Sequence, residues 1–253
     1  MVGWKVKKAI RAGNSSAVLV PVSWLDKEVR VELVDKSNEE ILRDVVEIVG
    51  RHIDSKDVIG IYLVGSYARG DNDSGSDIDV LVISDGVDRE VISEGVYEIM
   101  IVSEKLLRQK LKENLLPVGP MIVEAVSLIN GSYLEKIDVV VTKKNIKWYV
   151  DTTKEKISMI ERALKVGGKI DGVVAYTVVL RIRTLLMIDL LKRGKKYSKK
   201  EFFELVEKVA KGRGAYEDYL SVKGGGKGKG VDGEEVLRLL DYLKKKTVKW
   251  MAH

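Results

Sequence analysis

Apolar and polar residues in the first 36 positions follow short patterns typical of β structure. Residues 5–10 alternate partially with a period of two, and residues 29–33 alternate cleanly between apolar and charged side chains. A turn is expected at 13–15, followed by a strand at 18–20 that ends at Pro21. The sequence therefore predicts a small β-hairpin module at the beginning of the chain.

The middle of the chain begins with a helix signal and continues with three apolar strands. Ser37 and Glu40 form a capping box, and the residues after them place aliphatic side chains along one helical stripe through Ile53. Strands are expected at 59–64, 77–83 and 96–102, and Ser103 begins another helix.

The pattern becomes helical from Thr152 onward. Three N-terminal capping signatures occur, at Thr152, Ser198 and Asp232, each with a glutamate three residues later. The segment 173–191 is apolar almost all round, as in the central helix of a bundle. Residues 223–230 are rich in glycine and lysine and indicate a flexible loop.

Composition narrows the chemistry available to the chain of 253 residues. It has no cysteine and only two histidines, which excludes disulfides, thiolate catalysis and cysteine-based zinc sites and makes histidine-rich sites improbable. No apolar run approaches ~20 residues, and the start has no signal-peptide core, so we expect a cytoplasmic protein. Abundant lysine with little asparagine or glutamine hints at a thermophilic source.

Charge is distributed unevenly along the chain. The net charge is +3 over residues 1–36, −7 over 37–150 and +10 over 151–253. One interpretation is ordinary solvated charge. The other is an acidic metal site that faces a basic wall able to attract a polyanion.

Asp77 and Asp79 are the clearest candidates for chemistry. Two positions apart on a strand, they point to one face with Cα atoms about 6.6 Å apart, whereas Ile78 and Val80 point to the other face. Carboxylates in this arrangement bind hard cations such as Mg²⁺, and they repel each other when no cation is present. The alternative is a solvated acidic edge strand.

Gly65 and Ser66 lie where the preceding strand gives way to a turn. A glycine there allows close approach of backbone to a phosphate, and the Ser66 hydroxyl and Arg69 can donate hydrogen bonds to phosphate oxygens. A plain turn serine is the alternative. A P-loop is excluded because Asp71 and Asn72 stand where its Lys-Ser/Thr pair is required, and an EF-hand loop begun at Asp71 lacks its glycine and final glutamate.

Together these residues resemble the nucleotidyltransferase superfamily typified by DNA polymerase β, in its small stand-alone and kanamycin-nucleotidyltransferase-like branches. The shared pattern is Leu63-Val64-Gly65-Ser66, ten residues, then Asp77-Ile78-Asp79-Val80, and Ala68-Arg69-Gly70 also matches. The third family carboxylate corresponds to Glu98, where many relatives have aspartate.

The resemblance implies an α+β fold and three domains. These are an N-terminal hairpin module (1–36), a nucleotidyltransferase domain with a mixed sheet and helices on one side (37–148), and a C-terminal helical bundle (149–253). It also implies a mechanism that transfers a nucleoside monophosphate from an NTP to a hydroxyl group. Asp77, Asp79 and Glu98 would be the catalytic and metal-binding residues for two Mg²⁺ ions, with Mn²⁺ as a substitute. Gly65, Ser66 and Arg69 would bind the nucleotide, and Glu98 could accept the hydroxyl proton.

The flanking regions leave alternatives open. Residues 5–35 resemble an AbrB-type swapped-hairpin module, which implies a homodimer and candidate DNA contacts at Lys5, Lys7, Lys8 and Arg11. The other reading is a hairpin that only dimerises or covers the catalytic domain. Arg181 and Arg183 interrupt an apolar helix and favour a structural ion pair over a substrate contact.

Two functions therefore remain open. The first is a Mg²⁺-dependent nucleotidyltransferase acting on a protein, a small molecule or RNA. The second is a DNA-binding, antitoxin-like regulator that uses the fold for nucleotide or partner binding.

Overall fold

The structure is a computed structural model that describes residues 7, 9–31, 36–73, 75–165 and 171–252. It divides into two compact units, Met1–Ser37 and Asn38–His253. In the described part of the first unit, β1 (Ile10–Ala12) and β2 (Ser15–Ala17) form an antiparallel hairpin, and η1 (Val22–Trp24) is a 3₁₀ turn. Residues 18–20, which we expected to form a strand, are irregular, as are residues 29–31, whereas residues 32 and 33 of the second alternating segment lie outside the described residues. The hairpin strand ends earlier than its apolar pattern predicts.

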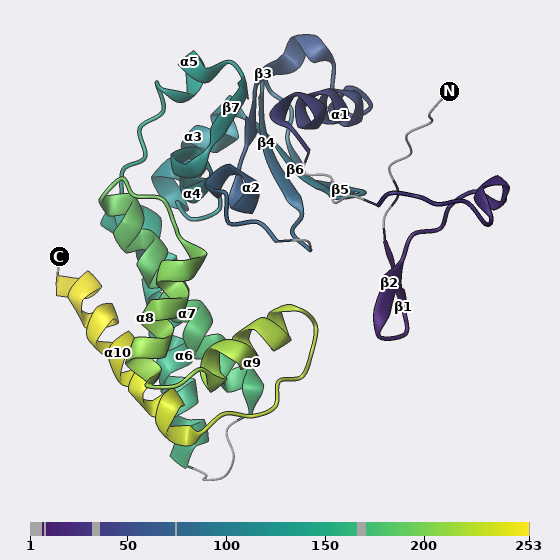
Figure 1. The fold of residues 1–253 in the computed structure, drawn as a ribbon. Helices are drawn as coiled ribbons and strands as arrows, with labels where there is room; N and C mark the ends of the chain where they lie inside the picture. Colours follow the sequence, from purple (N-terminus) through teal and green to yellow (C-terminus); the bar gives the residue numbers. More distant parts are fainter. Residues whose placement is uncertain (1–6, 8, 32–35, 74, 166–170, 253) are drawn as a thin grey trace. The chain divides into compact units, whose positions relative to one another are not determined.

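The second unit contains a five-stranded mixed sheet (Figure 1). Its strand order is β5-β6-β4-β3-β7, with β4 and β6 parallel and the other neighbours antiparallel. The three predicted strands are confirmed as β3, β4 and β6, whereas β5 and β7 were not predicted. The strand bounds are β3 Val58–Leu63, β4 Ile78–Ser84, β5 Arg89–Glu94, β6 Tyr97–Ser103 and β7 Val126–Ile129.

Helices cover both faces of this sheet. On one face, Ile78 and Val80 pack with the apolar stripe of α1 (Asn38–Gly50). On the other, Leu81 and Ile83 pack with side chains of α3 (Glu104–Glu113) and α4 (Gly119–Glu124). The expected α+β fold with a mixed sheet is confirmed, but helices lie on both faces rather than one. Both faces of the central strands are apolar, so both need cover. The remaining elements of this part are η2 Ser55–Asp57, α2 Gly65–Arg69 and α5 Gly131–Leu134.

The elements that the structure describes after α5 are all helices. Ser198 caps α8 as predicted, since its side chain accepts a hydrogen bond from the Glu201 amide, and Asp232 precedes α10. Thr152 does not begin a helix: it lies inside α6, where its hydroxyl bonds the Trp148 carbonyl. The helix bounds are α6 Lys143–Lys165, α7 Gly172–Lys192, α8 Lys199–Ala210, α9 Gly214–Lys223 and α10 Gly233–Ala252.

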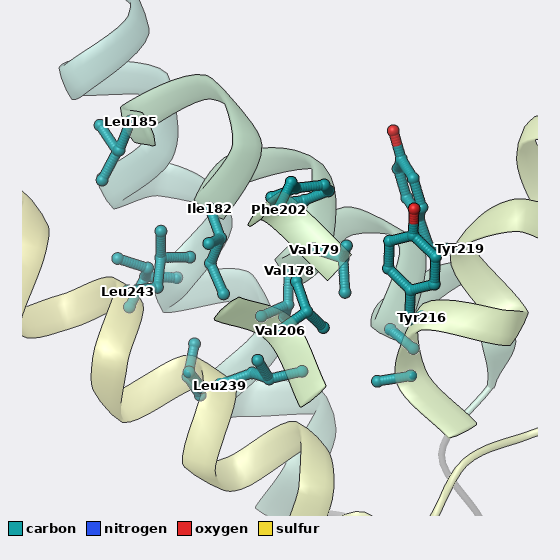
Figure 2. Close-up of a cluster of buried hydrophobic side chains, with 14 of the residues drawn as sticks. Val178, Val179, Ile182, Leu185, Phe202, Val206, Tyr216, Tyr219, Leu239 and Leu243 are labelled. Carbon is teal, nitrogen blue, oxygen red and sulfur yellow. The ribbon is translucent and has the colours of Figure 1, made fainter. Parts of the chain in front are cut away.

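The apolar helix α7 lies at the centre of the helical core, as its sequence indicates. Figure 2 shows Val178 and Ile182 of α7 among side chains of α8, α9 and α10, including Phe202 and Leu239. Burial on several sides explains why this helix lacks a polar face. No helix in the described residues is both long and apolar enough to cross a membrane.

Candidate active site

The two aspartates lie at the beginning of a central strand. Asp77 immediately precedes β4, and Asp79 is its second residue. Because side chains alternate along a strand, Asp79 shares the face of Leu81 and Ile83, which packs against α3 and α4. Glu98 is the register partner of Asp79 on the parallel strand β6, so it faces the same side. The fold thus brings all three acids to one end of one sheet face.

Asp79 is in an unfavourable environment for a lone carboxylate. Burial, followed by the negative charges of Asp77 and Glu124, raises the pKa of Asp79 above its ordinary value, and Glu98 adds a smaller effect. Arg69 opposes the shift but does not cancel it. A cation bound beside Asp79 would remove this repulsion.

Gly65 permits the close packing of the strand–turn junction against Asp79. Its φ is +68°, a left-handed conformation, and a Cβ atom there would overlap the Asp79 carboxylate. The Val64 amide also donates to the Asp79 carbonyl at 2.9 Å. Only glycine satisfies both the backbone angle and the space that the carboxylate occupies.

We expect Gly65→Ala to weaken the protein and displace Asp79. A strained backbone angle and the steric conflict together lower the free energy of unfolding by about 1–3 kcal/mol. The change should also reduce binding of Mn²⁺ with NTP. Denaturant unfolding and calorimetry measure the two effects. Gly70→Ala is a useful control, because Gly70 also has positive φ but open space at its Cβ position. Equal loss of ligand binding in both variants would contradict the close-approach argument.

A buried acid that the motif did not reveal lies beside Gly65. Glu124, at the end of α4, has a side chain that is 7% exposed. Its Oε1 accepts a hydrogen bond from the Gly65 amide at 2.9 Å, and its Oε2 accepts one from Arg69 Nη1 at 2.7 Å. Arg69 also pairs with Asp71, through Nη2 at 3.1 Å and Nε at 3.3 Å. The guanidinium group is therefore held between two carboxylates.

These residues border a cavity of about 640 Å³ within the second unit. One wall carries Asp77, Asp79 and the Gly65-Ser66 turn, and another carries side chains of α7, α8 and α9. Apolar side chains complete the lining. The helical wall includes Tyr197, from the connection between α7 and α8, and the helical residues Leu180, Arg183, Thr184, Met187, Lys199, Tyr216, Tyr219, Leu220 and Lys223.

Three cations stand on the helical wall. Lys199 Nζ pairs with Asp73 at 2.7 Å, whereas neither Arg183 nor Lys223 forms an ion pair among the described residues. Burial, then the nearby charges of Arg183 and Lys199, lowers the pKa of Lys223. The Arg183 guanidinium carbon lies 5.0 Å from the centre of the Tyr197 ring, and the Arg183 Nε is buried with no hydrogen-bond partner in the part of the chain that the structure describes. The cavity thus holds positive charge that an anionic ligand could neutralise.

The structure does not support our interpretation that Arg181 or Arg183 forms a structural ion pair with an acidic residue. Within the described residues neither has an acidic partner. Arg181 donates to Thr152 Oγ1 at 3.1 Å, and burial lowers its pKa. Arg183 instead lines the cavity.

The cavity fits a metal ion whose coordination is completed by a ligand. Among the described residues, no three acidic or histidine side chains form a ready-made metal cluster. Mg²⁺, however, commonly takes one or two protein carboxylates and fills its other positions with substrate phosphates and water. Asp77 and Asp79 provide two such carboxylates, and the raised pKa of Asp79 shows that Arg69 does not offset the burial and the negative charge around this carboxylate.

The predicted site residues separate into three groups. Gly65, Ser66, Arg69, Asp77 and Asp79 line the cavity. Glu98 lies beside Asp79 in the sheet but is not among the lining residues. Of the candidate DNA contacts in the first unit, Lys7 and Arg11 are exposed. The other two, Lys5 and Lys8, lie outside the described residues.

Sequence reasoning missed Glu124, Lys199 and Lys223. Glu124 had a usable signal, because it is the only acid in the apolar stretch 118–129 and a lone acid there requires a buried partner. The two lysines had none, since lysine is abundant throughout the C-terminal part.

Sequence comparison identifies the family of the region that carries most of the cavity lining. The nucleotidyltransferase domain family matches residues 39–197, which is more than half of the chain. The chain belongs to the nucleotidyltransferase domain family. The match spans the sheet, the Gly65-Ser66 turn and the helix that carries Arg183.

Two solved structures are similar to this chain at low sequence identity. A spectinomycin adenyltransferase from Enterococcus faecialis, solved with ATP and spectinomycin, is 15% identical, with a TM-score of 0.46 over 83% of this chain and 99% of that one. A nucleotidyltransferase-like protein from Exiguobacterium sibiricum is 14% identical, with a TM-score of 0.38 over 84% and 75%. Comparison with curated proteins finds no match.

Proposed function

We propose that this protein is a Mg²⁺-dependent nucleotidyltransferase that transfers a nucleoside monophosphate from an NTP to a hydroxyl group and releases pyrophosphate. The observation that carries the proposal is the cavity itself. Asp77 and Asp79 line the same cavity as Arg183, Lys199 and Lys223. A metal-bound triphosphate requires both kinds of charge, carboxylates toward the cation and basic groups toward the phosphate oxygens.

The residues of the cavity take separate roles in this proposal. Asp77 and Asp79 would hold Mg²⁺, which when bound lowers the pKa of the acceptor hydroxyl and neutralises charge on the leaving pyrophosphate. The Ser66 hydroxyl would donate a hydrogen bond to an oxygen of the β or γ phosphate. Because the Gly65 amide already donates to Glu124, the backbone donors left at this turn are the next amides of α2.

Arg183, Lys199 and Lys223 would bind the outer phosphate oxygens from the helical wall. The Lys199 ammonium exchanges its contact with Asp73 for phosphate. Glu98, beside Asp79, would accept the proton of the attacking hydroxyl. Oxygen attack forms the new bond to the α-phosphorus as the bond to the bridging oxygen breaks, and pyrophosphate leaves.

Labelled nucleotides test the reaction directly. The full chain is incubated with Mg²⁺, host lysate and each NTP carrying label at either the α or the γ phosphate. Nucleotidyl transfer attaches only the α label covalently to an acceptor, whereas phosphoryl transfer would attach only the γ label. Absence of both, together with no pyrophosphate release, would favour the regulator reading over an enzyme.

We also propose that a second copy of the chain covers the first unit. None of its described residues is buried, and Val22 and Leu25 are 88% and 72% exposed. A segment of this length has too little surface to bury to form a stable core alone. Apolar side chains repeated through a short hairpin unit suit an interleaved homodimer. The exposed cations Lys7 and Arg11 would then be free to contact DNA phosphates.

Deleting residues 1–37 should convert a dimer into a monomer that still binds nucleotide. The second unit has its own apolar cores, so it retains the cavity. Light scattering on the full and truncated chains measures mass, and nucleotide titration measures binding. A monomeric full chain would contradict the interleaved dimer. Any DNA binding by the full chain should weaken steeply with salt because it depends on phosphate contacts.

A further inference from the structure

A connected series of hydrogen bonds and ion pairs holds the Gly65-Ser66 turn in place. Gly65 and Arg69 are the first and last residues of α2, one helical turn apart. Glu124 reaches both, with one carboxylate oxygen on the Gly65 amide and the other on the Arg69 guanidinium. A single buried side chain therefore connects the two ends of the short helix that carries Ser66.

The same series of contacts continues to the helical wall of the cavity. Asp71 accepts from Arg69, and its Oδ2 also accepts from the backbone amide of Lys199 at 3.1 Å. Lys199 begins α8, which belongs to the helical wall. The turn, α4 and the start of α8 are thus joined through Glu124, Arg69 and Asp71.

The geometry of Arg69 leaves little of its hydrogen-bonding capacity for a ligand. All three guanidinium nitrogens contact a carboxylate, and the side chain is 14% exposed. A forked guanidinium suits this role because it can bind two carboxylates at fixed angles, which the point charge of lysine cannot do.

We propose that Glu124 is a positioning residue that, through Arg69, holds the Gly65-Ser66 turn in the conformation that receives the nucleotide phosphates. Arg69 accordingly acts as part of this brace and not as a phosphate ligand. The inference rests on the proposed nucleotidyl transfer. Since the turn contacts phosphates both before and during transfer, loss of the brace weakens binding of the ground state and the transition state alike.

Steady-state kinetics of Glu124→Gln provides the test. Glutamine keeps the shape and can still accept from Gly65, but it loses the charge that holds Arg69. We expect KM for the NTP to rise at least about tenfold while kcat changes by less than about threefold. A fall in kcat with unchanged KM would make Glu124 a catalytic group and overturn the proposal. Unchanged KM and kcat with only a lower Tm would assign it a structural role and overturn it equally.

Arg69→Lys and the double variant make the test independent of one substitution. If both residues act through one brace, Arg69→Lys raises KM by a similar factor, and the double variant is no worse than the more impaired single variant. If Arg69 binds phosphate by itself, the factors multiply, which overturns the proposal. Should Glu124→Gln fail to fold, Arg69→Lys retains a cation beside Glu124 and decides the question by the same division between KM and kcat.

The matched control is Glu113→Gln. Glu113 forms an exposed ion pair with Lys144 at 3.3 Å, outside the cavity lining, and the variant should match the wild type in both constants. If the wild type transfers nucleotide and Glu124→Gln has the same kcat and KM, only this inference is overturned. A wild type that transfers none overturns the proposed function, and this inference with it.

Discussion

Replacing Asp77 and Asp79 together with asparagine should abolish nucleotidyl transfer. The two amides cannot balance the charge of a divalent cation, so the metal and the triphosphate both lose their place in the cavity. In the wild type, a ligand that binds only the native state at 100 Kd adds about 2.7 kcal/mol, or roughly 5–10 °C in Tm for a chain of this size. We expect Mg²⁺ with NTP to produce this shift in the wild type and none in the variant.

Without ligand, the same variant should be as stable as the wild type or more stable. The pKa of Asp79 is raised in the folded protein, so stability falls as pH rises from the ordinary carboxyl pKa through the raised one. At neutral pH the ionised Asp79 therefore destabilises the fold, and an uncharged amide removes that effect. Thermal unfolding without ligand measures it.

Asp85→Asn is the control for this experiment. Asp85 is an exposed carboxylate just beyond the other end of β4, outside the cavity lining. This variant should keep both transfer and the ligand-induced shift. An equal shift in the double variant and the wild type would refute the assignment of Asp77 and Asp79 as metal ligands.

Glu98→Gln should slow transfer at least ~10²-fold while nucleotide affinity stays near that of the wild type. Glutamine preserves the shape of the side chain but cannot accept the hydroxyl proton. Glu98 lies beside Asp79 but outside the cavity lining, as we expect for a group that contacts the acceptor more than the nucleotide. A filter assay for bound NTP and a pyrophosphate-release assay separate the two effects.

Two further variants serve as controls for this prediction. Glu98→Asp should retain activity, because many members of the resembled family have aspartate at this place. Glu94→Gln changes an exposed acid on the neighbouring strand β5 that pairs with Arg51, and it should alter neither assay. A Glu98→Gln enzyme with normal turnover would exclude Glu98 as the proton acceptor.

The sequence by itself was sufficient to predict strand β4, which carries Asp79, and its neighbouring strands β3 and β6. The alternation of Asp77, Ile78, Asp79 and Val80 determines which side chains share a face, because the period of a strand is two. The continuous apolar run before Gly65 marks a buried strand, and the capping residues Ser103 and Ser198 begin helices where they were expected. These are local features, set by a few consecutive residues.

Thr152 shows where such local reasoning fails. Its spacing to Glu155 is that of a capping box, yet α6 begins nine residues earlier, at Lys143. Packing of the preceding turns against the helical core extends the helix beyond its apparent start. Tertiary contacts of this kind outweigh a capping preference worth about 1 kcal/mol.

Only the tertiary structure decided what faces the two aspartates. Glu124 lies 45 positions after Asp79 and Lys223 lies 144 positions after it, so no local pattern relates them. Their meeting depends on how α4, α8 and α9 pack around the cavity, which also turned Arg69 from an apparent phosphate donor into a residue held by two carboxylates. Charge pairing acts through space, at distances of a few ångströms, and it is therefore determined by packing and not by spacing along the chain.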